Sequence, residues 1–248
     1  MKKIAVLFTI TVLSLFPLFA DSRNIVYNQS FDIFGVDSVE ISLVYEELKI
    51  SRIYGDEISV EIGSNNIKKI PQVSCQNGVF KIENIDKKAK RGTRCTVYLY
   101  LPQDLDAMSI TINNVSGNIQ ADILRAQNTV AIGNVSGRTD IGACATELYN
   151  VTTVSGNATL QKVTAEYFDF SSTSGNIFAE LEAVPLASSG ITNISGKSQL
   201  YVPKGADLKL TTFSVSGGIS NSVAASVNPA APQITITSVS GKIEIREY

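Results

Sequence analysis

The stretch SITINNVSGNIQA, residues 109–121, recurs one period later as TVAIGNVSGRTDI, residues 129–141. Seven Ser-Gly pairs follow this period, at successive spacings of 20, 19, 19, 21, 21 and 24 residues. Their serines are Ser116, Ser136, Ser155, Ser174, Ser195, Ser216 and Ser240. Such regular spacing is typical of repeat proteins, in which each unit packs against the next.

When the copies are aligned on the serine, apolar residues fill the columns one, four and six residues before it and five residues after it. In the first copy these residues are Val115, Ile112, Ile110 and Ala121. The column two residues before the serine is polar and begins with Asn114. Apolar columns with a period of two predict strands with one buried face. We therefore expect the apolar columns inside and the polar columns outside.

The alternation breaks at each Ser-Gly pair, which predicts a corner between two strands. We expect the glycine to supply a positive φ angle there and the serine to bond the local backbone. A unit of strand, corner and strand cannot bury its apolar face alone, so the units must stack at about 4.8 Å per strand. The sequence therefore predicts an all-β solenoid, similar to a β-helix, with coils of about 20 residues.

The rest of the chain divides around this repeat. Residues 1–20 have the pattern of a signal peptide: Lys2 and Lys3 precede an apolar run, and a small residue, Ala20, ends it. Residues 21–107 are expected to form a less regular β region that caps the solenoid and continues into it, and residues 108–248 to form the regular repeats.

Two further expectations concern the ends of the stack. Residues 48–60 resemble a degenerate coil with its corner at Tyr54-Gly55. The last strand, residues 242–248, carries alternating charges. We expect this strand to be an exposed edge, because charges on an edge prevent pairing with other chains.

The composition excludes several kinds of chemistry. The 248 residues include 21 basic and 23 acidic side chains and no histidine, for a formal charge of −2. Without histidine, Ser-His-Asp and Cys-His catalysis and histidine metal sites are excluded, and the charge gives no reason to expect nucleic acid as a partner. Carboxylates such as Asp122, Asp140 and Glu166 fall in different columns. We expect neither catalysis nor a cofactor or metal.

The cysteines fit an exported protein. Cys75 and Cys95 lie in two β-like runs that flank a polar loop. An oxidising compartment would allow a disulfide between them. Cys144 is left over, and we expect it to be a small buried apolar residue, with an intermolecular bridge as the alternative.

The Val-Ser-Gly-Asn-Ile unit at residues 115–119 and the Val-Pro-Lys-Gly-Ala sequence at residues 202–206 resemble a bacterial family of adhesin-like domains of unknown function. That family is known for repeating Ser-Gly-Asp/Asn-Ile coils. The resemblance covers roughly residues 35–248. It implies a right-handed, single-stranded β-helix, and it brings no catalytic residues.

Two surfaces are candidates for binding. The first is the column two residues after each serine, whose stacked amides and cations would offer donors to a linear glycan. It contains Asn118, Arg138, Asn157, Asn176, Lys197 and Lys242. The second is a basic loop between Cys75 and Cys95, which would dock on anionic lipid headgroups, lipopolysaccharide or an acidic partner. It contains Lys87, Lys88, Lys90, Arg91 and Arg94. Ordinary solvent exposure is the alternative for both.

The sequence thus predicts an exported, adhesin-like binding module without catalytic activity, located in the periplasm, on the cell surface or outside the cell. Its partner would be an envelope or surface component, either protein or glycan. We expect no nucleic acid and no integral membrane span once the signal peptide is removed. Two alternatives stay open: a structural or regulatory periplasmic protein that binds another envelope component, and a carbohydrate-active β-helix enzyme.

Overall fold

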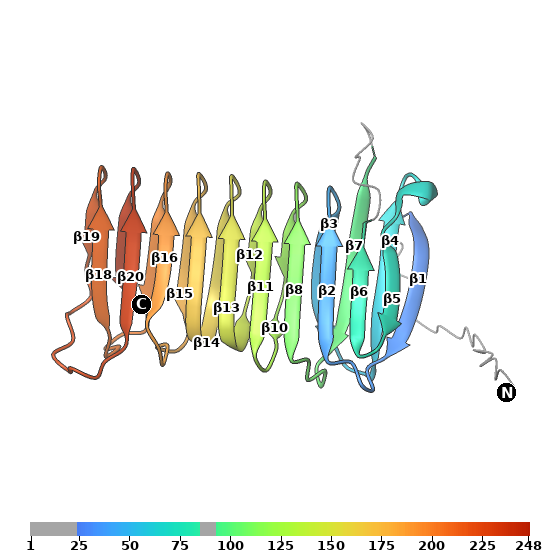
Figure 1. Ribbon diagram of the computed structural model, residues 1–248, viewed down its shortest axis with the longest axis horizontal. Coiled ribbons are helices and arrows are strands. Elements are labelled where there is room, and N and C mark those ends of the chain that lie inside the picture. The colour runs from blue at the N-terminus through green and yellow to red at the C-terminus, as the bar shows by residue number, and fades with distance from the viewer. Residues whose placement is uncertain (1–23, 85–92) are drawn as a thin grey trace, which may run out of the picture.

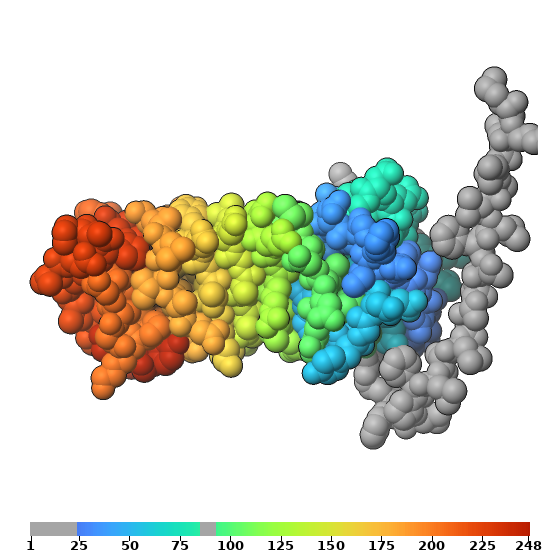
Figure 2. Space-filling view, turned by 90° about the horizontal axis from the view of Figure 1, so that it is seen from below, coloured from blue at the N-terminus to red at the C-terminus, as the bar shows by residue number. Residues whose placement is uncertain are grey.

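The computed structural model describes residues 24–84 and 93–248. They form an all-β rod of 21 strands with one short 3-10 helix, η1 (Ile67–Lys69). The coils lie side by side along the rod, and their corners line up along one edge (Figure 1). The described residues form one elongated body (Figure 2). One hydrophobic core runs from Val36 to Ile245. The predicted all-β solenoid is confirmed, whereas its handedness and a uniform coil size stay predictions.

The repeats form two opposite parallel sheets. Strands before the corners form face A: β8 (Ser109–Asn114), β11 (Thr129–Asn134), the last residues of β13 (Cys144–Thr153) and β14 (Ala158–Ser172), β16 (Ser189–Asn193), β18 (Lys209–Ser214) and β20 (Gln233–Ser238). Strands after the corners form face B: β9 (Ile119–Ala121), β12 (Thr139–Ile141), the first residues of β14, β15 (Ile177–Leu181), β17 (Ser198–Val202), β19 (Ile219–Asn221) and β21 (Ile243–Glu247). The short β10 (Leu124–Arg125) pairs with the start of β13. Neighbouring coils stack in register, so that Val130 pairs with Ile110.

Outside the coil of β18 and β19, three of the four predicted apolar columns are buried, but the column directly before the serine is not. Val115 is 46% exposed, whereas Asn114 beside it is only 3% exposed. The alternation is shifted because the chain turns between these two positions. The buried amides bond the preceding corner: Asn193 Nδ2 donates to the Gly175 carbonyl oxygen at 2.9 Å. The polar column therefore lies inside, where it joins one corner to the next.

The corner glycines serve a different purpose from the one predicted. Among the seven repeat glycines only Gly196 has a positive φ angle, +135°. At the others the constraint is space: a Cβ on Gly175 would overlap the carbonyl oxygen of Gly156 in the preceding corner. Glycine is thus required because successive corners approach each other closely.

The coils at the C-terminal end do not follow chain order. β20 pairs with β16 on one side and with β18 on the other, and β21 likewise lies between β17 and β19. The last coil is therefore inserted between the two that precede it, and the coil of β18 and β19 ends the rod (Figure 1). The prediction of an exposed edge at residues 242–248 is wrong, because β21 is paired on both sides.

The N-terminal end has a similar insertion. β2 (Ser38–Leu43) and β3 (Glu47–Ile53) form a coil beside β8 and β9, and its corner lies at residues 44–47 and not at Tyr54-Gly55. On its other side lie β6 (Val79–Glu83) and β7 (Cys95–Pro102). The antiparallel strands β1 (Ile25–Asp32), β4 (Glu57–Ser64) and β5 (Gln72–Gln76) close this end. Phe31 of β1 packs on Phe80, with ring centroids 5.4 Å apart.

The predicted disulfide is not formed: Cys75, Cys95 and Cys144 are all free thiols. Cys75 lies on β5, which pairs with β6 of face A, whereas Cys95 begins β7 of face B. The two residues that are close in sequence thus belong to opposite sheets. Burial raises the pKa of Cys95 to about 12. Cys144 is buried in the core, as predicted.

Candidate binding face

Face B carries outward side chains of several chemical kinds towards its C-terminal end. β15, β17 and β21 lie side by side in register, so that Phe178 pairs with Gln199 and Gln199 with Glu244. Alternate residues of a strand point to the same side, and three outward positions from each segment form a grid of nine side chains. The grid consists of Asn176, Phe178, Glu180, Lys197, Gln199, Tyr201, Lys242, Glu244 and Arg246.

Three cations of this grid surround one carboxylate. Glu244 lies 2.6 Å from Lys197 Nζ and 3.9 Å from Lys242 Nζ, and its other oxygen pairs with Arg246. Its side chain is only 4% exposed. The hydrogen bond from Lys197, supported by the three positive charges, lowers the pKa of Glu244. This pairing stabilises the fold above the ordinary pKa of a glutamate and is lost as the pH falls through the lowered value.

Two aromatic rings lie beside this cation cluster. Phe178 and Tyr201 are diagonal neighbours with ring centroids 5.1 Å apart and planes inclined by 44°. Both are half-buried, so each ring is accessible from solvent over part of its surface. Apolar ring surfaces next to a few polar and charged groups are the usual lining of small-molecule and sugar sites.

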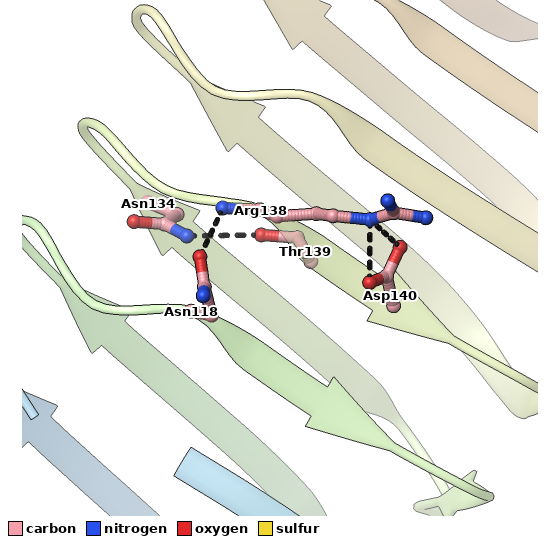
Figure 3. A network of polar contacts seen from close by, with 5 residues as sticks. All are labelled: Asn118, Asn134, Arg138, Thr139 and Asp140. Carbon is pink, nitrogen blue, oxygen red and sulfur yellow. Dashed lines mark hydrogen bonds and ion pairs between the residues drawn. The ribbon is translucent and has the colours of Figure 1, made fainter. Parts of the chain in front are cut away.

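A shallow depression lies further along face B, towards the N-terminal end. Its volume is about 270 Å³, and residues of β9, β12 and β14 and the loops beside them line it. Two carboxylates, Asp122 and Asp140, belong to the lining. Arg138 is bound to Asp140, with Nε 2.7 Å from Oδ1, and is itself part of the lining (Figure 3). The depression and the grid therefore belong to one continuous polar strip.

The predicted column of amides and cations does form a row along this face. Backbone bonds join its members in the spatial order Asn118, Arg138, Asn157, Asn176, Lys197 and Lys242. The asparagines also have a structural role: Asn118 Oδ1 accepts from the Arg138 amide at 2.9 Å, and Asn176 Oδ1 from the Lys197 amide at 2.8 Å. Their side-chain oxygens are therefore engaged in holding neighbouring coils together, as Figure 3 shows for Asn118.

A larger hollow, with a volume of about 500 Å³, lies beside β10, the short strand that connects face B to face A. It is lined by the loop at residues 103–106, by β10 and by the start of β13. Gln127 Nε2 already binds Asp106 Oδ2 at 2.5 Å, and the lining contains no aromatic side chain. The hollow therefore lacks the combination of groups that face B offers.

Several predictions fall outside the described residues. These are the signal peptide, residues 1–20, and the basic-loop residues Lys87, Lys88, Lys90 and Arg91. Arg94 is described, and its backbone amide donates to Asn65 Oδ1 at 3.0 Å. Within residues 24–84 and 93–248, no helix has the length and hydrophobicity of a membrane span. The same residues contain no group of three or more Cys, Asp or Glu side chains arranged to hold a metal ion.

Sequence reasoning missed most of the grid. It identified Asn176, Lys197 and Lys242. It did not identify Phe178, Tyr201 or Glu244. These residues stand four and six positions after their serines, which are outward positions on the same strands. The predicted row stands two residues after each serine. If the alternation is continued to the fourth and sixth residues after the serine, all of these side chains fall on the same face.

The fold and the polar strip define an all-β solenoid with one long polar face. The profile of the Toastrack DUF4097 family matches residues 36–247. The chain belongs to this family. No curated protein matches the sequence.

Three solved structures of bacterial proteins are similar to this chain over most of its length. A protein of Parabacteroides distasonis, described as a candidate lipid-binding protein, is 11% identical, with 90% of this chain and 96% of that chain covered and a TM-score of 0.51. A candidate cell adhesion protein of Clostridium sporogenes is 11% identical, with 90% and 99% covered and a TM-score of 0.47. A candidate adhesin of Parabacteroides merdae is 12% identical, with 90% and 95% covered and a TM-score of 0.45.

Proposed function

We propose that the protein is an exported, adhesin-like binding module that holds a linear anionic polymer of the cell envelope along face B and catalyses no reaction. The observation that carries this proposal is the grid, in which two aromatic rings and three cations lie next to each other on one flat sheet. Export is supported by the signal-like residues 1–20.

The shape of face B suits a polymer. Its rows of side chains repeat at about 4.8 Å along the rod, which is close to the length of one sugar ring in an extended polysaccharide. A chain of sugars lying parallel to the rod would therefore place successive rings over successive coils.

The charge of the grid favours an acidic polymer. Of the two carboxylates in the grid only Glu244 is bound to the three cations, and with Glu180 counted the grid keeps a net charge of +1, which is carried by these cations. Sulfate, phosphate or uronate groups would satisfy them through charge-assisted hydrogen bonds, which are stronger than neutral ones. Tyr201 would meanwhile contact the apolar face of a sugar ring.

The test is the affinity of the purified chain for dextran sulfate, with neutral dextran and anionic lipid vesicles as competitors. We expect binding of dextran sulfate and about fivefold weaker binding by Tyr201→Ala, since an aromatic contact contributes about 1 kcal/mol. Tyr167→Ala, an outward tyrosine on face A, is the matched control and should bind normally. Equal losses in both variants, or preference for vesicles, would refute the proposal; preference for vesicles would also give this chain the lipid-binding property named for the Parabacteroides distasonis protein.

A further inference from the structure

The C-terminal end of the rod is an open end of both sheets. Among the described strands, β18 pairs only with β20, and β19 only with β21. The backbone amide of Lys209 donates to the carbonyl oxygen of Pro232, just before β20. That of Val215 donates to the carbonyl oxygen of Ser238, at the end of β20. Because parallel strands bond at alternate residues, the backbone groups of Leu210, Thr212 and Ser214 point away from β20, towards the open end.

The side chains at this end leave the core partly uncovered. Leu210 and Thr212, which point inward, are half-exposed, and Ile219 of β19 is 46% exposed. Phe213 beside them is 61% exposed. Lys209 is the only charged side chain on these two strands. An edge without guarding charges, a bulge or a proline is a template for pairing with another strand.

The opposite end is built differently. There the antiparallel strands β1, β4 and β5 cover the coil of β6 and β7, and Phe31 packs over Phe80. Phe80 is fully buried as a result. Within the described residues β1 and β5 also pair on one side only, but the core behind them is covered. Only the C-terminal end leaves inward-pointing residues exposed, and two such ends can cover each other.

We propose that the C-terminal end pairs with the same end of a second copy of this chain, around a twofold axis perpendicular to the sheets. Antiparallel pairing of β18 with its symmetry mate can use all three outward-directed residues: Leu210 opposite Ser214 of the second copy, and Thr212 opposite its own mate. Side chains that point inward then face inward in both copies. The contact is closed, so it produces a dimer and not a filament.

This geometry has a consequence for face B. A twofold axis perpendicular to a sheet leaves that sheet facing the same way, so the two face B surfaces become one continuous surface of twice the length. A polymer that contacts both would bind with a high effective concentration at the second site. The dimer itself does not depend on what face B binds.

The test is sedimentation of residues 21–248 over a wide range of protein concentration. We expect a dimer for the natural chain and a monomer with an unchanged circular dichroism spectrum for the double variant Thr212→Lys, Ile219→Lys, since inward-pointing charges block an edge. Thr235→Lys adds an outward-pointing charge one strand inside the edge; it is the control for added charge and should remain a dimer. A monomeric natural chain, or a double variant that still forms the dimer, would overturn the proposal.

A crosslink tests the arrangement without a destabilising charge. In a Cys75→Ser background, Thr212→Cys should form an intermolecular disulfide. The reason is that hydrogen-bonded antiparallel partners lie about 5.5 Å apart at Cα, within the range for a disulfide. Thr235→Cys lies one strand further from the axis and should not crosslink. A dimer in which Thr212→Cys stays reduced under oxidising conditions would contradict the proposed pairing.

Discussion

Gly175→Ala is expected to destabilise the fold by about 3 kcal/mol, at the upper end of the usual cost of overpacking. The added Cβ would overlap the carbonyl oxygen of Gly156 in the neighbouring corner. That oxygen belongs to the backbone and cannot rotate away, so the two coils would have to separate. Separation would also lengthen the backbone bond from Ser174 N to the Val154 carbonyl oxygen, now 2.8 Å.

Gly218→Ala is the matched control for this prediction. Gly218 also follows a Ser-Gly corner, but a Cβ there would meet nothing within 4 Å, and its φ angle is not positive. Urea unfolding should show a clearly lower midpoint for Gly175→Ala and almost no change for Gly218→Ala. Equal midpoints for Gly175→Ala and the natural protein would contradict the close approach of the corners.

Glu46→Ala is expected to cost about 4 kcal/mol, because each buried donor left without a partner costs about 1–3 kcal/mol. Glu46 is fully buried and replaces the corner glycine in the coil of β2 and β3. Its Oε2 accepts from the amides of Val44 and Tyr45 at 2.9 and 3.0 Å, and its Oε1 is bound by Asn84. Alanine removes the acceptor for all three donors.

The neighbouring glutamate provides the control. Glu47 is exposed, so Glu47→Ala should leave the urea midpoint nearly unchanged. Glu46→Gln keeps one acceptor oxygen and the side-chain volume, and should recover roughly half of the loss. If Glu46→Ala and Glu47→Ala have the same small effect, the carboxylate is not what holds this corner.

The repeat was predictable because it is local. Residues such as Ile110 and Ile112 alternate with polar residues within one strand, and this alternation alone identifies the buried side. The corner was harder to predict, because the direction of Asn114 and Val115 depends on where the chain turns. From the sequence, a polar residue next to a valine is expected to point outward, yet the amide lies inside and bonds the preceding corner.

The order of the coils was not predicted, because it depends on pairing between distant segments. A signal was nevertheless present. The coil that ends the rod has Thr212 and Asn221 in its inward columns, whereas the last coil of the chain has Ile236 and Ile245 at the same places. Only the second coil is apolar enough to be covered on both sides, which agrees with its inserted position.

The candidate site was predicted in part for a similar reason. The predicted column contained Asn176, Lys197 and Lys242. It did not contain Glu244, because the cations that bind Glu244 come from different repeats. The prediction of a disulfide between Cys75 and Cys95 was wrong. Closeness in sequence does not reveal that the two strands belong to opposite sheets.

The most direct test of the binding face compares two triple variants with the same change in charge. Lys197→Gln, Lys242→Gln, Arg246→Gln removes the grid cations, and Lys68→Gln, Lys69→Gln, Lys81→Gln removes three cations from elsewhere. We predict that the first weakens binding of dextran sulfate about tenfold or more, at about 0.5–1 kcal/mol per contact, and that the second has little effect. Equal affinities of the two variants would show that net charge, and not face B, binds the polymer.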